Sequence, residues 1–165
     1  MDIRSMTPTD LEQVLTIQRR CYPPQYHEPL GAFENKIRQS PTSAWLAVEA
    51  EMALAYLVTL PVDEDHFPAL HAVNWQPPVR PKWLYLHDLA VDPDHRGSGA
   101  GQGLVQRAFE HARASGLAGL ALVAVQGSQP YWHKQGFQAR QVDHPGLLAK
   151  LRSFGTDASF MTLDS

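Results

Sequence analysis

The most informative segment of the sequence is Leu89-Ala90-Val91-Asp92-Pro93-Asp94-His95-Arg96-Gly97-Ser98-Gly99-Ala100-Gly101-Gln102-Gly103. Four of the chain's eleven glycines alternate between 97 and 103, after a strand-like run and before a helix-like run. Glycine lets backbone N–H groups approach an anion closely, and the helix N-terminus behind them adds about half a positive charge. The pattern therefore predicts a cradle for a phosphate or diphosphate, built by Arg96, Gly97, Ser98, Gly99, Ala100, Gly101 and Gln102.

The sequence does not match the motifs of two well-known phosphate-binding loops. A P-loop requires a Gly-Lys pair, and the chain has none. A dinucleotide fingerprint requires G-x-G-x-x-G, but the last position falls on Gln102 or on Leu104. The alternative to a phosphate-binding loop is a glycine-rich turn that binds no ligand, and this alternative stays open.

The elements around this stretch follow from hydrophobic periodicity and from capping residues. Strands alternate with helices in the order β-α-α-β-β-β-α-β-α-β-α-β, which predicts a mixed α/β layer of about seven strands with helices on both faces. The expected strands cover Asp2–Met6, Ala44–Val48, Met52–Leu60, Trp83–Val91, Leu117–Val125, Gln138–Val142 and Ala158–Leu163. The expected helices begin at the Thr7 cap and cover Pro29–Ser40, Gln102–Ser115, Ser128–Gln135 and Leu147–Phe154.

Composition restricts the class of protein. The 165 residues fit a single domain, 1–165, and 44% hydrophobic with 19% charged residues is a globular composition. A net charge of −3 argues against a nucleic-acid footprint. The N-terminus has no secretory signal and no apolar run is long enough to span a membrane, so we expect a cytoplasmic protein. Cys21 stands alone, and His66 and His71 lack metal-ligand spacing, so no metal is expected.

Prolines cluster in two segments. Pro23, Pro24 and Pro29 mark one loop, and five prolines lie between Pro61 and Pro81. The second segment is long for a connection inside a compact domain, and loops of that length are usually functional covers or disordered.

Arg96-Gly97-Ser98-Gly99-Ala100-Gly101 matches the acetyl-CoA motif [RQ]-x-x-G-x-[GA] of the GNAT superfamily of N-acetyltransferases. Leu89-Ala90-Val91-Asp92-Pro93 and Tyr131-Trp132-His133-Lys134-Gln135-Gly136-Phe137 are similar to that family's strand end and to its short helix before Gly-Phe. The resemblance covers about 55 residues and implies a single-domain GNAT fold with a centrally splayed sheet. It also implies acetyl-CoA as co-substrate, with no metal.

By this resemblance, the strand ending at Val91 separates from its parallel neighbour. Leu89, Ala90 and Val91 would hold the pantetheine arm, and an N–H near Leu89–Ala90 would polarise the thioester carbonyl. The glycine loop would hold the diphosphate.

Leu86-His87-Asp88-Leu89-Ala90-Val91 looks most like the arylalkylamine (serotonin) N-acetyltransferases. His87 matches the second histidine of their His-x-His pair, and Tyr85 stands where the first would be. His87 would act as general base, because an amine must lose a proton before it attacks the thioester. Tyr131 is one residue away from the family's acid tyrosine, and it would be the group that protonates the leaving thiolate.

Strict alternation along the strand puts His87 on one face with Tyr85 and Leu89, and Asp88 on the opposite face. A bulge near Asp88–Leu89 would break this alternation.

The first proline-rich segment lines the acceptor site in GNAT folds. Aromatic side chains there would suit an aryl or apolar amine, and a carboxylate would pair with its ammonium; the candidates are Tyr22, Tyr26, Glu28 and Phe33. We therefore expect a small primary amine as acceptor. A protein or peptide N-acetyltransferase and a non-catalytic acyl-CoA-binding module stay open as alternatives, and the sequence does not settle the oligomeric state.

Overall fold

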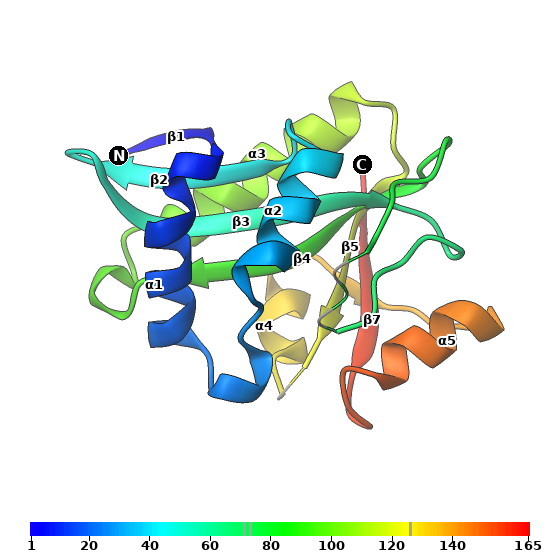
Figure 1. The fold of residues 1–165 in the computed structure, drawn as a ribbon. Coiled ribbons are helices and arrows are strands. Elements are labelled where there is room, and N and C mark those ends of the chain that lie inside the picture. The colour runs from blue at the N-terminus through cyan, green and yellow to red at the C-terminus, as the bar shows by residue number, and fades with distance from the viewer. Residues whose placement is uncertain (71, 73, 126) are drawn as a thin grey trace.

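The computed structural model describes residues 1–70, 72, 74–125 and 127–165. Seven strands form one sheet in the order β1-β2-β3-β4-β5-β7-β6, flanked by helices on both faces (Figure 1). All neighbours pair antiparallel except β4 and β5, which run parallel. The strands are β1 (Asp2–Ser5), β2 (Ala44–Glu49), β3 (Met52–Val62), β4 (Trp83–Val91), β5 (Gly119–Ala124), β6 (Gln138–Ala139) and β7 (Ser159–Asp164).

The helices are α1 (Leu11–Cys21), α2 (Leu30–Gln39), α3 (Ala100–Ala114), α4 (Gln129–Lys134) and α5 (Pro145–Arg152). The predicted α/β class and the order of elements are therefore confirmed. The boundaries shift by a few residues, most clearly at β6, where pairing with β7 ends after Ala139 and not at Val142.

The first helical segment starts as its sequence predicts. A 3₁₀ turn at Pro8–Asp10 leads into α1, the Thr7 N–H donates to the Asp10 carboxylate over 2.8 Å, and Arg4 pairs with the same carboxylate. α1 ends where Tyr22 adopts an extended conformation before Pro23, because a residue that precedes proline is disfavoured in the helical region.

The core lies on both faces of the sheet. On one face, α1 and α2 bury an apolar cluster that includes Val14, Phe33 and Tyr56. On the other face, α3 packs Leu104 and Ala108 against Leu84 and other residues of the central strands. The two faces are therefore distinct, and a β4 side chain belongs to one or the other.

Residues 63–82 join β3 to β4 without a described helix or strand of their own, as the proline-rich segment predicts. Phe67 and Trp75 from this segment are buried against Tyr85 and Phe160 on the α1–α2 side of the sheet, so the described residues of this covering segment pack onto the domain.

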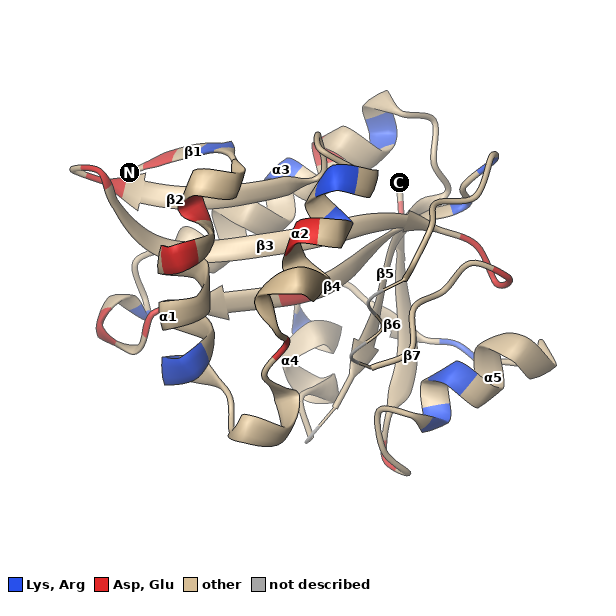
Figure 2. Cartoon of the chain, viewed as in Figure 1, with Lys and Arg blue, Asp and Glu red and all other residues tan. Residues whose placement is uncertain are grey.

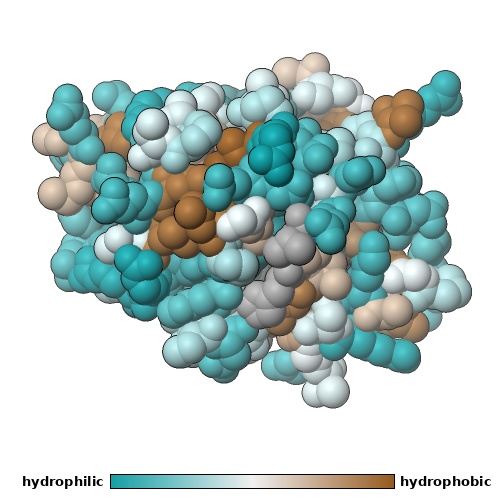
Figure 3. Space-filling view, viewed as in Figure 1, coloured by the Kyte–Doolittle hydropathy of each residue, from teal (hydrophilic) through white to brown (hydrophobic). Residues whose placement is uncertain are grey.

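The surface carries both signs of charge, and Figure 2 shows acidic and basic residues together on α1 and on α2. In the same view, Figure 3 shows a mostly polar surface with an apolar area between these two helices. No helix in the described part of the chain has the length and apolar character needed to cross a bilayer.

Candidate functional site

A bulge in β4 determines which side chains reach the site. Val58 of β3 pairs with Asp88, but the next residue, Thr59, pairs with Leu86, so His87 is an extra residue without a cross-strand partner. His87 contacts the Tyr85 ring, and Asp88 accepts a 2.7 Å hydrogen bond from Tyr56 on the α1–α2 face.

The expectation from strict alternation is therefore wrong. Leu86 and Leu89 pack against the α3 cluster, whereas His87 and Asp88 both face α1 and α2. The bulge lies at His87 itself, one residue before the Asp88–Leu89 position considered from the sequence.

β4 and β5 separate in the middle of the sheet. Their pairing covers only Trp83, Leu84 and Tyr85 of β4 and ends two residues before His87, as the splayed sheet predicts. Beyond this point the Leu89 carbonyl accepts a hydrogen bond from the Tyr22 hydroxyl (2.5 Å), and the Val91 carbonyl accepts one from Cys21 Sγ (3.1 Å). Because a strand residue presents its N–H and C=O at the same edge, the N–H groups of Leu89 and Val91 also face the gap.

A cavity of about 730 Å³ fills the gap and continues to the α1–α2 side. Its described lining includes every cofactor-site residue predicted from the sequence, Leu89, Ala90, Val91 and Arg96 to Gln102, together with His87 and Tyr131. β5 contributes Leu122 and Val123, Val125 follows this strand, and the covering segment contributes Leu70.

The glycine loop joins β4 to α3 at one end of the cavity. Gly97 and Gly99 have φ values of +82° and +86°, a region that residues with a Cβ rarely adopt, and Gly99 caps α3. α3 therefore begins at Ala100, two residues before the predicted start. The N–H groups of Gly101 and Gln102 belong to its first turn, which has no intrahelical acceptors for them.

The loop is anchored to α1 by charge. Arg20 forms ion pairs with Asp92 and Asp94, and the Asp92 side chain also accepts the Asp94 N–H over 2.9 Å. Arg96 lines the cavity, and it is the only lysine or arginine to do so in the described part of the chain.

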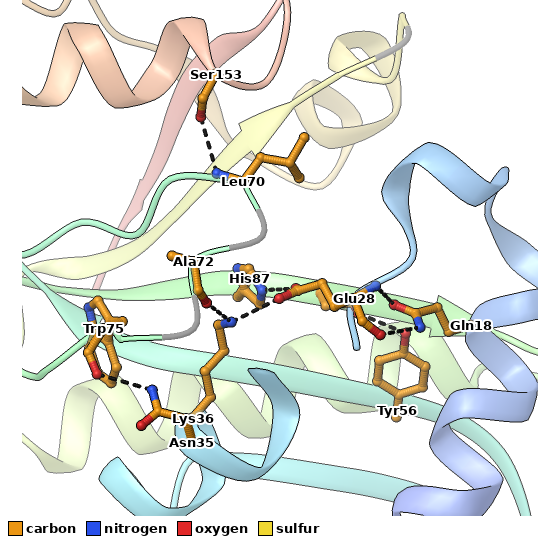
Figure 4. A network of polar contacts seen from close by, with 11 residues as sticks. Gln18, Glu28, Asn35, Lys36, Tyr56, Leu70, Ala72, Trp75, His87 and Ser153 are labelled. Atoms are coloured by element: carbon orange, nitrogen blue, oxygen red, sulfur yellow. Dashed lines mark hydrogen bonds and ion pairs between the residues drawn. The ribbon is translucent and has the colours of Figure 1, made fainter. Parts of the chain in front are cut away.

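Three ionisable side chains, Lys36, Glu28 and His87, form a chain of contacts (Figure 4). Lys36 Nζ lies 2.8 Å from one oxygen of Glu28, and His87 Nε2 hydrogen-bonds to the other. All three are nearly inaccessible, with side-chain exposures of 1% for Lys36, 6% for Glu28 and 3% for His87. Burial pushes the pKa of Glu28 upward, but His87 and Lys36 outweigh it and lower the pKa to about 2.

Asp88 is the second carboxyl of the site and has a different environment. Burial and the negative Glu28 raise the pKa of Asp88 to about 6, although His87 and the Tyr56 hydroxyl act in the opposite direction. Asp88 has no ion-pair partner among the described residues. Burial and Asp88 raise the pKa values of Tyr22 and Tyr56 well above the usual range, so both remain proton donors.

The predicted acceptor residues divide into two groups. Tyr22, Tyr26 and Glu28 line the cavity, whereas Phe33 is buried in the core, edge-on to Tyr56. Glu28 has both oxygens engaged by Lys36 and His87, and the Tyr22 hydroxyl is engaged by Leu89. Tyr131 is 48% exposed on α4 and packs against Trp132 at the cavity wall.

Sequence reasoning missed Lys36 and Asp88. A detectable signal for Lys36 was present, because it falls on the apolar stripe of α2 between Phe33 and Ile37, at i+3 from the first. Asp88 gave no such signal, since its orientation depends on the bulge.

No group of three His, Cys, Asp or Glu side chains suited to a metal ion occurs among the described residues. His66 pairs with Asp63 over 2.8 Å, and His71 lies outside the part of the chain that the structure describes.

Residues 11–137 match the model of the Acetyltransferase (GNAT) family. A curated relative, glucosamine 6-phosphate N-acetyltransferase from Trypanosoma brucei brucei, is 33% identical over 57 residues. That match covers 34% of this chain and 39% of the relative, so the matched part of the chain spans about two fifths of the relative's length.

Solved structures resemble the whole chain at lower identity. Ard1 from Thermoplasma volcanium has a TM-score of 0.74 at 16% identity, covering 99% of this chain and 96% of its own. The PaiA N-acetyltransferase from Thermoplasma acidophilum, solved in complex with coenzyme A, has a TM-score of 0.72 at 14% identity, covering 99% and 98%. At these identities the likeness establishes the fold.

Proposed function

The chain belongs to the acetyltransferase (GNAT) family, and from this premise we propose that it transfers the acetyl group of acetyl-CoA to a primary amine on a small molecule with an apolar or aromatic body. The whole chain, 1–165, would be one acetyltransferase domain. The observation that carries this proposal is the gap between β4 and β5, which opens beside His87 and runs toward the glycine loop that follows Val91.

The residues around the gap fit acetyl-CoA. The strand edge at Leu89 and Val91 offers N–H groups without a neighbouring strand, which an extended amide-containing arm can pair with. Gly101 and Gln102 offer free N–H groups at the start of α3, and Arg96 adds a positive charge for a diphosphate. When bound there, acetyl-CoA would supply an activated acetyl thioester.

His87 is the proposed general base. It lies at the point where the strands separate, and it faces the side on which Tyr22 and Tyr26 line the cavity. An aliphatic amine is protonated at neutral pH, so a base must remove a proton before the amine can attack. His87 would take that proton, directly or through water.

Tyr131 is the proposed proton donor for the departing thiolate. It lines the cavity from α4, and its hydroxyl can donate a hydrogen bond. Its exposure lets it recover a proton from solvent after each turnover.

The lining of the acceptor side supports an amine without a phosphate group. Aromatic and apolar side chains dominate it, and Asp88 is a carboxylate without a cation partner among the described residues. Arg96 lies on the glycine loop and Lys36 is already paired with Glu28, so neither is free for a second phosphate. The acceptor side therefore does not suit glucosamine 6-phosphate, which would need a cation for its phosphate group. An arylalkylamine-type acceptor, as the strand histidine implies, fits this lining.

A peptide acceptor is the alternative. The covering segment opposes it, because side chains of α2 and of Ser153, the residue after α5, hold this segment over the acceptor side. Asn35 donates to the Trp75 carbonyl (3.2 Å), Lys36 donates to the Ala72 carbonyl (2.9 Å), and the Leu70 N–H donates to Ser153 (3.1 Å). A non-catalytic acyl-CoA-binding module would not need the buried charges around His87.

The test is a panel of acceptors with acetyl-CoA and detection of the released thiol. The panel contains 2-phenylethylamine, tryptamine, spermidine, glucosamine 6-phosphate and peptides with a free N-terminus. We expect turnover with the arylalkylamines and none with the phosphorylated sugar. Turnover confined to peptides would establish the alternative, and binding of CoA without any turnover would favour the binding module.

A further inference from the structure

The Lys36–Glu28–His87 chain of contacts (Figure 4) carries an inference that rests on the proposed function and deepens it. We propose that Glu28 is a positioning residue for His87: it holds the imidazole in the tautomer that leaves Nδ1 free to accept the proton of the acceptor amine, and Lys36 holds Glu28 in place. Glu28 then acts through His87 and does not bind the acceptor.

The backbone of Glu28 is fixed independently of its side chain. Gln18 of α1 receives the Glu28 N–H on Oε1 (2.8 Å) and donates Nε2–H to the Glu28 carbonyl (3.1 Å). This two-point contact pins a loop residue between the 3₁₀ turn at Pro24–Tyr26 and α2. The carboxylate is therefore presented to β4 by a rigid support, as positioning requires.

The charges decide which nitrogen of His87 carries hydrogen. The Lys36 ammonium can only donate, and its 2.8 Å contact favours the ionised form of Glu28, which can only accept. His87 must then donate Nε2–H to Glu28. In the neutral imidazole the lone pair remains on Nδ1, which is buried and has no hydrogen-bond partner among the described residues.

The His87 side chain is 97% buried and lines the cavity. A buried Nδ1 without a hydrogen-bond partner costs free energy unless a ligand donates a hydrogen bond to it. The acceptor's N–H, or a water that relays its proton, is the group that would complete it. The geometry thus separates the two nitrogens by function: Nε2 orients the ring and Nδ1 receives the proton.

A purely structural role for Lys36 must be distinguished from this one, because Lys36 also holds the covering segment through the Ala72 carbonyl. Asn35 offers a matched control. It is the adjacent residue of α2 and holds the same segment through the Trp75 carbonyl, and no hydrogen bond drawn in Figure 4 joins it to Glu28 or His87. Asn35→Ala therefore loosens the cover and leaves the ion pairs intact.

The experiment is ¹⁵N NMR of the histidine imidazoles in the full chain, with His87 assigned by comparison with His87→Gln. We expect the Nε2–H tautomer for neutral His87 in the wild type and in Asn35→Ala, and a mixture or the Nδ1–H tautomer once Glu28 is removed. Two variants remove it, Glu28→Ala and the double variant Glu28→Leu/Lys36→Met; the second removes both partners of the ion pair, leaves no unpaired charge at either position, and protects the test against misfolding.

Kinetics with the best acceptor of the panel complete the test. Loss of Glu28 should lower kcat by roughly 10²-fold with KM for acetyl-CoA unchanged, because orientation of the base is lost and the cofactor site is not. Lys36→Met should lower kcat more than Asn35→Ala. An Nδ1–H tautomer in the wild type, or an unchanged tautomer without Glu28, would overturn the proposal. Because the NMR readout needs no acceptor, absence of turnover in the wild type counts against the proposed function alone.

Discussion

His87 and Asp88 are consecutive residues of strand β4, yet both side chains face helices α1 and α2. Regular alternation forbids this arrangement, and the bulge at His87 produces it. The same irregularity lies two residues beyond the last pair between β4 and β5, which is at Tyr85. One local departure from strand geometry therefore places an imidazole and a carboxyl group together where the cavity opens.

The role of His87 makes the first prediction. His87→Gln should lower kcat by about 10²-fold or more at neutral pH, because an amide side chain cannot take the proton of the acceptor. CoA affinity, measured by calorimetry, should stay unchanged, since His87 lies outside the glycine loop. An unchanged kcat across the pH range would assign the base to another group.

Replacing a carboxyl group by an amide should have opposite effects on stability at the two acidic residues beside His87. The pKa of Asp88 is raised from 3.8 to about 6. Ionisation of Asp88 therefore lowers the free energy of unfolding progressively as pH rises from about 4 to 6. Asp88→Asn should therefore stabilise the fold at pH 7.5, by on the order of 2–3 kcal/mol, and leave it nearly unchanged at pH 4.

Glu28 gives the opposite sign. Its pKa is lowered from 4.5 to about 2, so its stabilising contribution is present above pH 4.5 and disappears as pH falls toward 2. Glu28→Gln should lower the melting temperature at pH 7.5 while Asp88→Asn raises it. Thermal unfolding of both variants at pH 7.5 and pH 4 checks the pair; equal signs at pH 7.5 would contradict the assigned environments.

The β2–β3 hairpin supplies a prediction that involves no active-site residue. Its two-residue turn holds Ala50 and Glu51 at φ values of +50° and +66°, the left-handed region that costs residues with a Cβ roughly 1 kcal/mol each. Glu51→Gly should stabilise the protein by about 1 kcal/mol in chemical denaturation, with kcat unaffected. No gain in stability would show that the turn is not strained as described.

Much of this site could be predicted because it is local in sequence. The glycine loop, the strand before it and the helix after it are contiguous, and all of the residues predicted to bind the cofactor line one cavity. The sequence predicts the start of α3 two residues late, because glycines at 99 and 101 weaken a helical pattern, although Gly99 is the cap.

The remainder depends on contacts between distant residues. Glu28 and His87 are 59 residues apart, and their pairing depends on a loop fixed by Gln18 and on a bulge that periodicity cannot reveal. Phe33 shows that the residue type alone does not separate a site residue from a core residue. An aromatic side chain in this segment suits core packing equally well, and Phe33 lies in the core.

The central claim is that the glycine loop binds the diphosphate of coenzyme A, and calorimetric titration with CoA tests it most directly. The matched pair is Gly99→Val and Gly116→Val, because both glycines have positive φ (+86° and +71°) and neither would bring a Cβ within 4 Å of another group. Gly116 follows the C-cap of α3, far along the chain from the glycine loop, so Gly116→Val introduces the same backbone strain away from the proposed diphosphate site.

We predict that wild type and Gly116→Val bind CoA alike and that Gly99→Val weakens binding by roughly 10²-fold or more, because the first-turn N–H groups no longer converge. Wild-type affinity in Gly99→Val, or no CoA binding by the wild type, would contradict the claim.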